Sequence, residues 1–404
     1  MKLATYFISK SLVSFFGLLF QLCIIWLMGV HYGGIVNTYQ IYGLAISFII
    51  FPGIELTFLR ALPAMKVGRE ADYKLLTSRI QLAGAACFTG SVILSAMAIV
   101  LLAGILQDIV LVTVTAILFA LMRVFPVMLR IDGRQASSVV LEQGNLFLVA
   151  LLMLPIALVW ELDPTTYWGV TLLVTSVNFT IIVFLGIDKM VQLGEIRPQI
   201  NWSPIRSDYG VSIILTSISN FGILWLPMTV STFFLSATDI ALTVTSLRLI
   251  GILLFVEGIA AAYYLPRISA EVNSDLPAQS VQRFRVLSFI GTAGAGLAIY
   301  VLFAVGVVPV DKETNAYLVF FAVIQLTICL TGSPYSLASV LCSLKSVRRM
   351  TLIMLSLIIL TLVLLALFPD PRTVIASFIG LQTIKAFLGY VALIQERIPV
   401  RSLK

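Results

Sequence analysis

Two charged residues, Arg248 and Glu257, lie inside a stretch that is apolar enough to cross a membrane, SLRLIGILLFVEGIAAAYYLPRIS. A charged side chain at the centre of a bilayer costs about 2.5–3.5 kcal/mol on insertion scales, so it should face protein or water rather than lipid. The two residues are nine positions apart, which places them on opposite sides of a helix. We therefore expect one of them to face a water-filled cavity while the other contacts a neighbouring helix.

Arg248 is the first candidate for binding an anionic substrate in such a cavity, and a structural ion pair is its alternative. Lys10 and Gln21 are further candidates, because with Ser14 and Gly17 they occupy one helical face near the N-terminus. Arg60 is a fourth candidate, although a long basic side chain near a helix end can also reach water by extending along the helix.

Two glutamates in apolar stretches, Glu55 and Glu257, could couple transport to an ion such as a proton or sodium. Intramembrane carboxylates commonly form proton relays in pumps and transporters. The alternative for both is solvation near a helix end.

The composition supports a chain that lies mostly within lipid. Of its 404 residues, 60% are hydrophobic and only 11% are charged, whereas a soluble protein has about 25% charged residues. Because a membrane-spanning helix needs about 20 apolar residues, we predict an all-α polytopic membrane protein with about twelve transmembrane helices. The predicted spans are residues 6–29, 38–62, 80–104, 109–129, 138–160, 167–187, 209–234, 239–263, 286–308, 314–342, 350–368 and 373–394. The tenth contains Gly332-Ser333-Pro334, which predicts a kink.

The charges of the connecting loops predict the orientation. Alternate loops are rich in lysine and arginine, while the loops between them are short and mostly acidic. By the positive-inside rule, both termini are cytoplasmic. The net charge of +7 then belongs to the cytoplasmic membrane face and its lipids, and a nucleic-acid partner is not expected.

The chain divides into two similar halves. Its longest hydrophilic segment, about residues 188–208, is near the middle, and the Leu-Pro pairs Leu62-Pro63 and Leu265-Pro266 each precede a basic loop. We predict two six-helix lobes, residues 1–204 and 205–404, related by a parallel repeat.

Signatures of catalysis are absent from the sequence. It has no glycine-rich phosphate loop, no GxSxG and no HExxH. The single histidine and the four cysteines, which all lie in or beside apolar runs, predict neither a metal site nor a cofactor. Transport is the function that remains.

The segments Ser246-Leu247-Arg248-Leu249 and Tyr264-Leu265-Pro266-Arg267-Ile268-Ser269 resemble the eighth helix of lipid II flippases. With the twelve spans, they make the chain similar to the MOP flippase superfamily, in particular to Wzx-type polysaccharide flippases. The resemblance implies a multi-pass protein of the bacterial cytoplasmic membrane. It would translocate undecaprenyl-diphosphate-linked oligosaccharide repeat units by alternating access of its lobes, for O-antigen or exopolysaccharide synthesis. It would work beside a polysaccharide polymerase complex, and Arg248 would belong to the cavity.

Two departures from the resembling proteins define the alternatives. The chain lacks the two additional helices of lipid II flippases, and its first helix lacks the acidic residue common in MATE exporters. A MATE-like, cation-coupled exporter of small molecules is the second hypothesis, although such a substrate favours carboxylates in the cavity. A polytopic polysaccharide polymerase or ligase is the third, although such an enzyme needs a sizeable outer loop.

Overall fold

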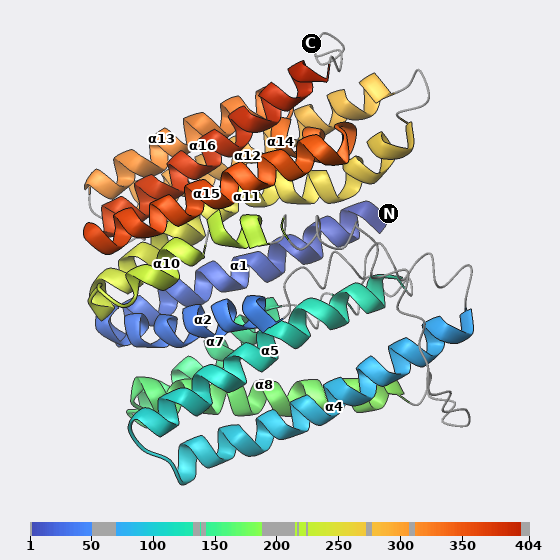
Figure 1. The fold of residues 1–404 in the computed structure, drawn as a ribbon. Helices are drawn as coiled ribbons and strands as arrows, with labels where there is room; N and C mark the ends of the chain where they lie inside the picture. Colours follow the sequence, from blue (N-terminus) through green and yellow to red (C-terminus); the bar gives the residue numbers. More distant parts are fainter. Residues whose placement is uncertain are drawn as a thin grey trace. The chain divides into compact units, whose positions relative to one another are not determined.

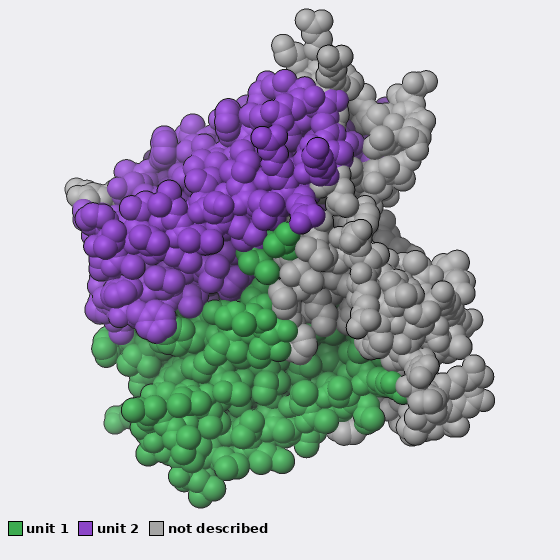
Figure 2. All heavy atoms as spheres, viewed as in Figure 1, with its two compact units in different colours: residues 1–218 green, residues 219–404 purple. Residues whose placement is uncertain are grey.

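The computed structural model describes most of the chain. The described residues are 2–50, 70–131, 143–187, 218–223, 225–271, 277–306 and 312–396, with the single residues 138 and 215. Two compact units, residues 1–218 and 219–404, are distinguished by their internal contacts (Figure 2). The domain boundary predicted after residue 204 falls outside the described residues and stays a prediction.

The first unit consists of long helices that pack side by side (Figure 1). Its described helices are α1 (Lys2–Met28), α2 (Val30–Ile50), α4 (Glu70–Val100), α5 (Ile105–Ile131), α7 (Gln143–Val159) and α8 (Pro164–Ile187). Short turns join α1 to α2, α4 to α5 and α7 to α8.

The second unit has the same all-helical character (Figure 1). Its described helices are α10 (Leu226–Ser231), α11 (Ala237–Glu271), α12 (Pro277–Ala304), α13 (Lys312–Leu330), α14 (Pro334–Leu341), α15 (Leu344–Leu367) and α16 (Pro371–Gln395).

The described helices coincide with the predicted membrane spans. Eight of them are long and apolar enough to cross a bilayer, and three shorter apolar helices fall on further predicted spans. The buried share of the long spans ranges from 17% to 61%, since lipid rather than protein covers much of an apolar helix surface in a membrane. Residues 209–214, 216, 217 and 224 of the predicted span 209–234 are outside the described residues, and α10 lies in the described remainder. The predicted fold class, an all-α polytopic membrane protein, is confirmed.

The helices of the two units have corresponding neighbours. In the first unit, α1 packs on α7, α2 packs on α5 and α8, and α7 packs on α8. In the second, α10 packs on α15, α11 packs on α13, α14 and α16, and α15 packs on α16. Two of the most extensive contacts, α4 on α8 and α11 on α12, have no comparable counterpart in the other unit among the described residues, so the parallel repeat stays a prediction.

The connection between α1 and α2 is shorter than the sequence predicted. The polar segment around His31 was expected to be a loop, but α2 begins at Val30. Gly29, with φ +96°, provides the reversal directly after α1, because glycine alone adopts this left-handed region without strain. Tyr32, Asn37 and Tyr39 therefore lie on a helix.

The tenth predicted span is broken rather than bent. α13 ends at Leu330 and α14 begins at Pro334, with Gly332 at φ +83° and Ser333 at φ +50° between them. Pro334 cannot donate a backbone hydrogen bond, so the helix cannot continue through it. The kink predicted from Gly332-Ser333-Pro334 is confirmed as a complete interruption.

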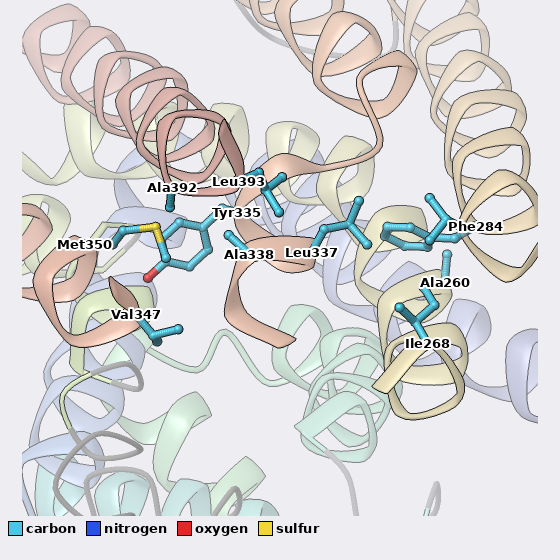
Figure 3. Close-up of a cluster of buried hydrophobic side chains, with 11 residues drawn as sticks. Ala260, Ile268, Phe284, Tyr335, Leu337, Ala338, Val347, Met350, Ala392 and Leu393 are labelled. Atoms are coloured by element: carbon cyan, nitrogen blue, oxygen red, sulfur yellow. The ribbon is translucent and has the colours of Figure 1, made fainter. Parts of the chain in front are cut away.

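The short helix α14 is held within the second unit by apolar packing. Leu337 and Ala338 of α14 lie in a buried cluster with side chains of α11, α12, α15 and α16 (Figure 3). The labelled members from those helices are Ala260, Ile268, Phe284, Val347, Met350, Ala392 and Leu393. The interrupted helix is consequently anchored on its neighbours.

Gly389 of α16 permits the closest of these contacts. A Cβ atom at this position would lie 2.3 Å from the backbone nitrogen of Tyr335 and 2.4 Å from its Cα. We expect Gly389→Ala to destabilise the protein by about 1–3 kcal/mol, the usual cost of overpacking, and to lower its melting temperature in detergent. Gly380→Ala is the matched control on the same helix, because nothing lies within 4 Å of its Cβ position. Equal melting temperatures for the two variants would contradict this account.

Candidate functional site

Arg248 lies on a face of α11 where two glycines leave space beside it, although its own Nε atom is buried. It is only partly buried, as are Gly251, Ile252 and Phe255, and Gly258 is exposed. These residues follow one another at helical spacing along a single face. Nothing lies within 4 Å of a Cβ atom at Gly251 or Gly258. Because a guanidinium is costly in lipid, a face that combines it with open space is suited to water or to a polar ligand.

Glu257 lies on the opposite face of α11 and contacts the interrupted helix. The side-chain amide of Gln325 on α13 donates to one carboxylate oxygen at 2.5 Å, and the hydroxyl of Ser336 on α14 donates to the other at 3.4 Å. The opposite placement of Arg248 and Glu257 predicted from their spacing is therefore seen, and Glu257 is the one that contacts neighbouring helices. Charge-assisted hydrogen bonds contribute about 1.5–3 kcal/mol each. These two bonds therefore link α11 to the interruption between α13 and α14, residues 331–333, which we call the break.

Lys385 on α16 brings a positive charge to the same region. Its ammonium donates to the side-chain oxygen of Asn220 at 2.9 Å and lies 4.8 Å from the centroid of the Tyr335 ring. Tyr335 and Ser336 are adjacent at the start of α14, so the break has an ammonium on one side and a carboxylate on the other.

Further polar side chains lie near Gln325, on α12 and at the end of α13. The hydroxyl of Thr292 is 3.5 Å from the sulfur of Cys329, and the Gln325 amide is 3.9 Å from the same sulfur. Thr292, Gln325 and Cys329 are all buried. We refer to Glu257, Gln325, Ser336, Lys385 and Asn220 as the break cluster.

The guanidinium of Arg285 binds the backbone carbonyl oxygen at the end of α13. The last residue of α13, Leu330, has a backbone carbonyl that the interrupted helix leaves without its usual partner. Arg285 of α12 donates to this oxygen from Nε at 3.0 Å, and Nη2 donates to it as well. The negative end of the α13 dipole is thereby neutralised from within the protein.

In the first unit, a buried arginine joins the equivalent pair of helices. Arg123 of α5 is 9% exposed. One of its terminal nitrogens donates to the backbone oxygen of Ser47 on α2 at 3.3 Å, and its guanidinium lies 3.4 Å from the centroid of the Phe48 ring. Arg123 therefore makes a cation–π contact within the first unit and does not extend along its helix to water.

Acidic residues gather at one end of the first unit. The Tyr39 hydroxyl donates to Asp108 and is 3.1 Å from the hydroxyl of Thr165. The carboxylate of Asp163 accepts from the backbone nitrogens of Thr165 and Thr166 at the start of α8. Burial raises the pKa of Asp163, but these hydrogen bonds outweigh it and hold the pKa below its ordinary value. The α4–α5 and α7–α8 turns thus lie at the same end of this unit.

The other predicted site residues are placed as follows. Gln21 on α1 is fully buried, so a ligand could reach it only if the surrounding helices separated, and its substrate-binding role stays a prediction. Lys10 falls on α1, but its side chain is outside the described part of the structure. Arg60 and Glu55 lie in the segment 51–69, also outside the described residues. The described residues therefore do not test whether Lys10 and Arg60 lie near Arg248, and that grouping stays a prediction.

Sequence reasoning missed most of the break cluster. Gln325 and Ser336 were not singled out, because uncharged polar residues are common in membrane helices. The charge of Lys385 within the last apolar run was a usable signal, but its partner was not evident. The acceptor observed for its ammonium is Asn220.

This architecture, two units of helices with an interrupted helix in the second, is similar to the fold of solved flippase and multidrug-transporter structures. Among solved structures, the chain is similar to the lipid II flippase MurJ in an inward closed conformation. The TM-score is 0.62 at 12% sequence identity, covering 99% of this chain and 89% of that one.

Two multidrug-transporter structures are similar to a comparable degree. An inward-facing multidrug resistance MATE family transporter of the MOP superfamily has a TM-score of 0.58 at 13% identity, covering 98% of this chain and 95% of that one. MATE in the bent conformation has a TM-score of 0.56 at 14% identity, covering 99% and 95% respectively. No protein-family model matches the chain, and no curated protein matches its sequence. At these identities the likeness establishes the fold.

Proposed function

We propose that the chain is a Wzx-type flippase that moves undecaprenyl-diphosphate-linked oligosaccharide repeat units across the bacterial cytoplasmic membrane, for O-antigen or exopolysaccharide synthesis. The observation that carries the proposal is the open face of α11, where Arg248 is partly exposed and Gly251 leaves space beside it. The overall fold, similar to that of a lipid II flippase, adds support.

The physical requirement of such a reaction suits this face. Sugars and a diphosphate must pass about 30 Å of hydrocarbon, while the polyprenyl tail can stay in lipid. A guanidinium compensates for the hydration that the diphosphate loses, and its planar array of donors matches phosphate oxygens. In the proposed cycle the two lobes alternate access, and the open face of α11 binds the diphosphate.

The orientation of the protein follows from its charges. The basic loops would lie in the cytoplasm, together with both termini, and would contact anionic lipids there. The grouped acidic turns near Asp108 and Asp163 would then lie at the periplasmic end. A polysaccharide polymerase complex is the partner that would consume the translocated repeat unit.

Removing the protein tests the proposal directly. In a depletion strain of the native host, we expect surface polysaccharide to fall at least about tenfold, since no other step would move the repeat unit across the membrane. The lipid-linked glycan should accumulate and stay protected from a membrane-impermeant reagent added to intact cells. Re-expression of the wild-type chain should reverse both effects, and unchanged polysaccharide with no accumulated glycan would overturn the proposal.

A MATE-like exporter is the second candidate, because MATE structures are similar over nearly the whole chain and a carboxylate, Glu257, lies within the second unit. The same depletion strain separates the two. Increased sensitivity to cationic drugs with normal polysaccharide would favour the exporter. A polysaccharide polymerase or ligase would instead leave the lipid-linked glycan accessible from outside.

A further inference from the structure

The ammonium of Lys385 lies within the last membrane span and contacts a neutral side chain. Its hydrogen-bond acceptor is the amide oxygen of Asn220, and it forms no ion pair with any carboxylate in the described part of the chain. The carboxylate of Glu257 accepts from Gln325 and Ser336 instead. Because a charge within a span is costly unless a partner or water compensates it, this ammonium is suited to bind an anion from outside the protein.

The contact between Lys385 and Asn220 leaves a group of hydrogen-bond donors. The amide oxygen of Asn220 is used at 2.9 Å from the ammonium nitrogen, which leaves the amide nitrogen with its two N–H groups for another acceptor. An ammonium has three N–H donors and no acceptor, and only one of them is needed for this bond. The pair therefore presents hydrogens, which suit the oxygens of an anion and repel a metal cation.

A buried aromatic ring holds the ammonium in place. The centroid of the Tyr335 ring is 4.8 Å from the Nζ atom of Lys385. Tyr335 is only 8% exposed and lies in the buried cluster with Val347 and Ala392 (Figure 3). A cation that is held on an aromatic face loses little further freedom when it binds a ligand, so the site is preorganised.

The side of the pair away from this ring is open. Asn220 is exposed, and Lys385 and Gln382 are only partly buried. Gln382 precedes Lys385 by three positions and so lies on the same face of α16. Polar groups that reach the surface within a span are costly in hydrocarbon. This face of the second unit is therefore suited to water and to a polar ligand.

The depth of Lys385 in its helix is similar to that of Arg248. Arg248 is the twelfth residue of α11 and Lys385 is the fifteenth of α16, and the two helices pack on each other. In the predicted topology both helices run inward from the outer side of the membrane. At 1.5 Å per residue, the two positions differ by about 5 Å along their helices, so both cations lie well inside their spans.

We propose that Lys385 and Asn220 form an oxyanion site, separate from Arg248, that binds a phosphate or carboxylate group of the transported molecule. The two groups share one chemistry, negatively charged oxygens that accept charge-assisted hydrogen bonds. In a lipid-linked oligosaccharide, the diphosphate or an acidic sugar supplies them. The inference rests on the proposed function for the identity of the transported molecule, whereas anion binding itself needs no transport.

Protection of Lys385 from acylation tests this site. The full-length protein in lipid nanodiscs is treated with a water-soluble N-hydroxysuccinimide ester, and mass spectrometry follows the labelling of each lysine. Lys385 should be labelled, because its open side meets water. Inorganic pyrophosphate or glucuronate, each at several times its dissociation constant, should slow this labelling about fivefold relative to sodium chloride of equal ionic strength. Lys345, exposed at the start of α15, calibrates the reagent.

Asn220→Asp is the critical variant. It keeps the acceptor for Lys385 and nearly the same shape, but it supplies the negative charge itself and removes the amide donors. Protection of Lys385 by both anions should therefore be lost, while labelling of Lys345 should match the wild type. Asn220→Ala removes the amide donors without adding a charge, should weaken the protection, and serves if Asn220→Asp is not monodisperse on gel filtration.

The two anions distinguish the source of the oxygens. Protection by pyrophosphate alone identifies the diphosphate, protection by glucuronate alone identifies an acidic sugar, and protection by both identifies a site that accepts either. Failure of the reagent to label Lys385, absence of protection by both anions, or protection that persists in Asn220→Asp would overturn the inference. No transport is measured here, so failure is distinct from failure of the proposed flippase activity, which the depletion strain reports.

Discussion

Replacing Arg248 by alanine is expected to abolish surface polysaccharide while the protein remains in the membrane. The open face of α11 would lose its guanidinium, and a bound diphosphate would lose at least one charge-assisted hydrogen bond, worth about 1.5–3 kcal/mol. Because 1.4 kcal/mol corresponds to a factor of ten, translocation should slow by about 10–100-fold. Because the Nε atom of Arg248 is buried, the amount of folded protein must be measured beside the activity, by gel filtration in detergent.

The measurement is surface polysaccharide per cell, normalised to the amount of protein in the membrane fraction. Arg248→Lys should retain part of the activity, since it keeps the charge but not the planar donors. Gly251→Leu should also reduce translocation, because it fills the space beside the guanidinium without touching its charge. Arg283→Ala is the control, an exposed arginine of the neighbouring helix α12, and should behave as wild type. Normal polysaccharide from Arg248→Ala at native expression would show that Arg248 does not bind the substrate.

The fold was predictable because lipid imposes a simple constraint on sequence. A polypeptide in hydrocarbon must satisfy its own backbone hydrogen bonds, so apolar runs of sufficient length become helices. The break in the tenth span was also predictable, because Pro334 and Gly332 act on their own backbone and not through contacts with other helices. The start of α2 was not, since Tyr32 and Asn37 look like loop residues until their contacts within the first unit are known.

The candidate site was predictable only in part, for a related physical reason. Arg248 and Glu257 were visible because a charge in an apolar run is costly wherever its partners are, and their spacing gave their opposite directions. Their partners come from other helices: Gln325 is 68 residues from Glu257, and Asn220 is 165 residues from Lys385. Such pairings depend on which helices pack together, and periodicity within one helix does not report that.

Replacing Glu257 by glutamine is expected to slow translocation at least about tenfold without removing the protein from the membrane. Glutamine has nearly the same shape, so the packing of α11 on the break should persist. It cannot exchange a proton, however. Its hydrogen bonds to Gln325 and Ser336 are also no longer charge-assisted, which weakens the two bonds together by about 1.5–3 kcal/mol. The variant should therefore resemble a permanently protonated state, and its residual translocation should be independent of an imposed pH gradient.

The stability of the variants gives this prediction a second readout. Removing the charge of Glu257 weakens the hydrogen bonds that Gln325 and Ser336 donate to it. Glu257→Gln should therefore lower the melting temperature in detergent by a few degrees, because these hydrogen bonds link α11 to α13 and α14. Glu396→Gln is the matched control: its carboxylate also accepts from two serines, Ser343 and Ser346, but lies beyond the last span. If Glu257→Gln retained full translocation with an intact response to the pH gradient, the break cluster would be a purely structural link between α11 and α14.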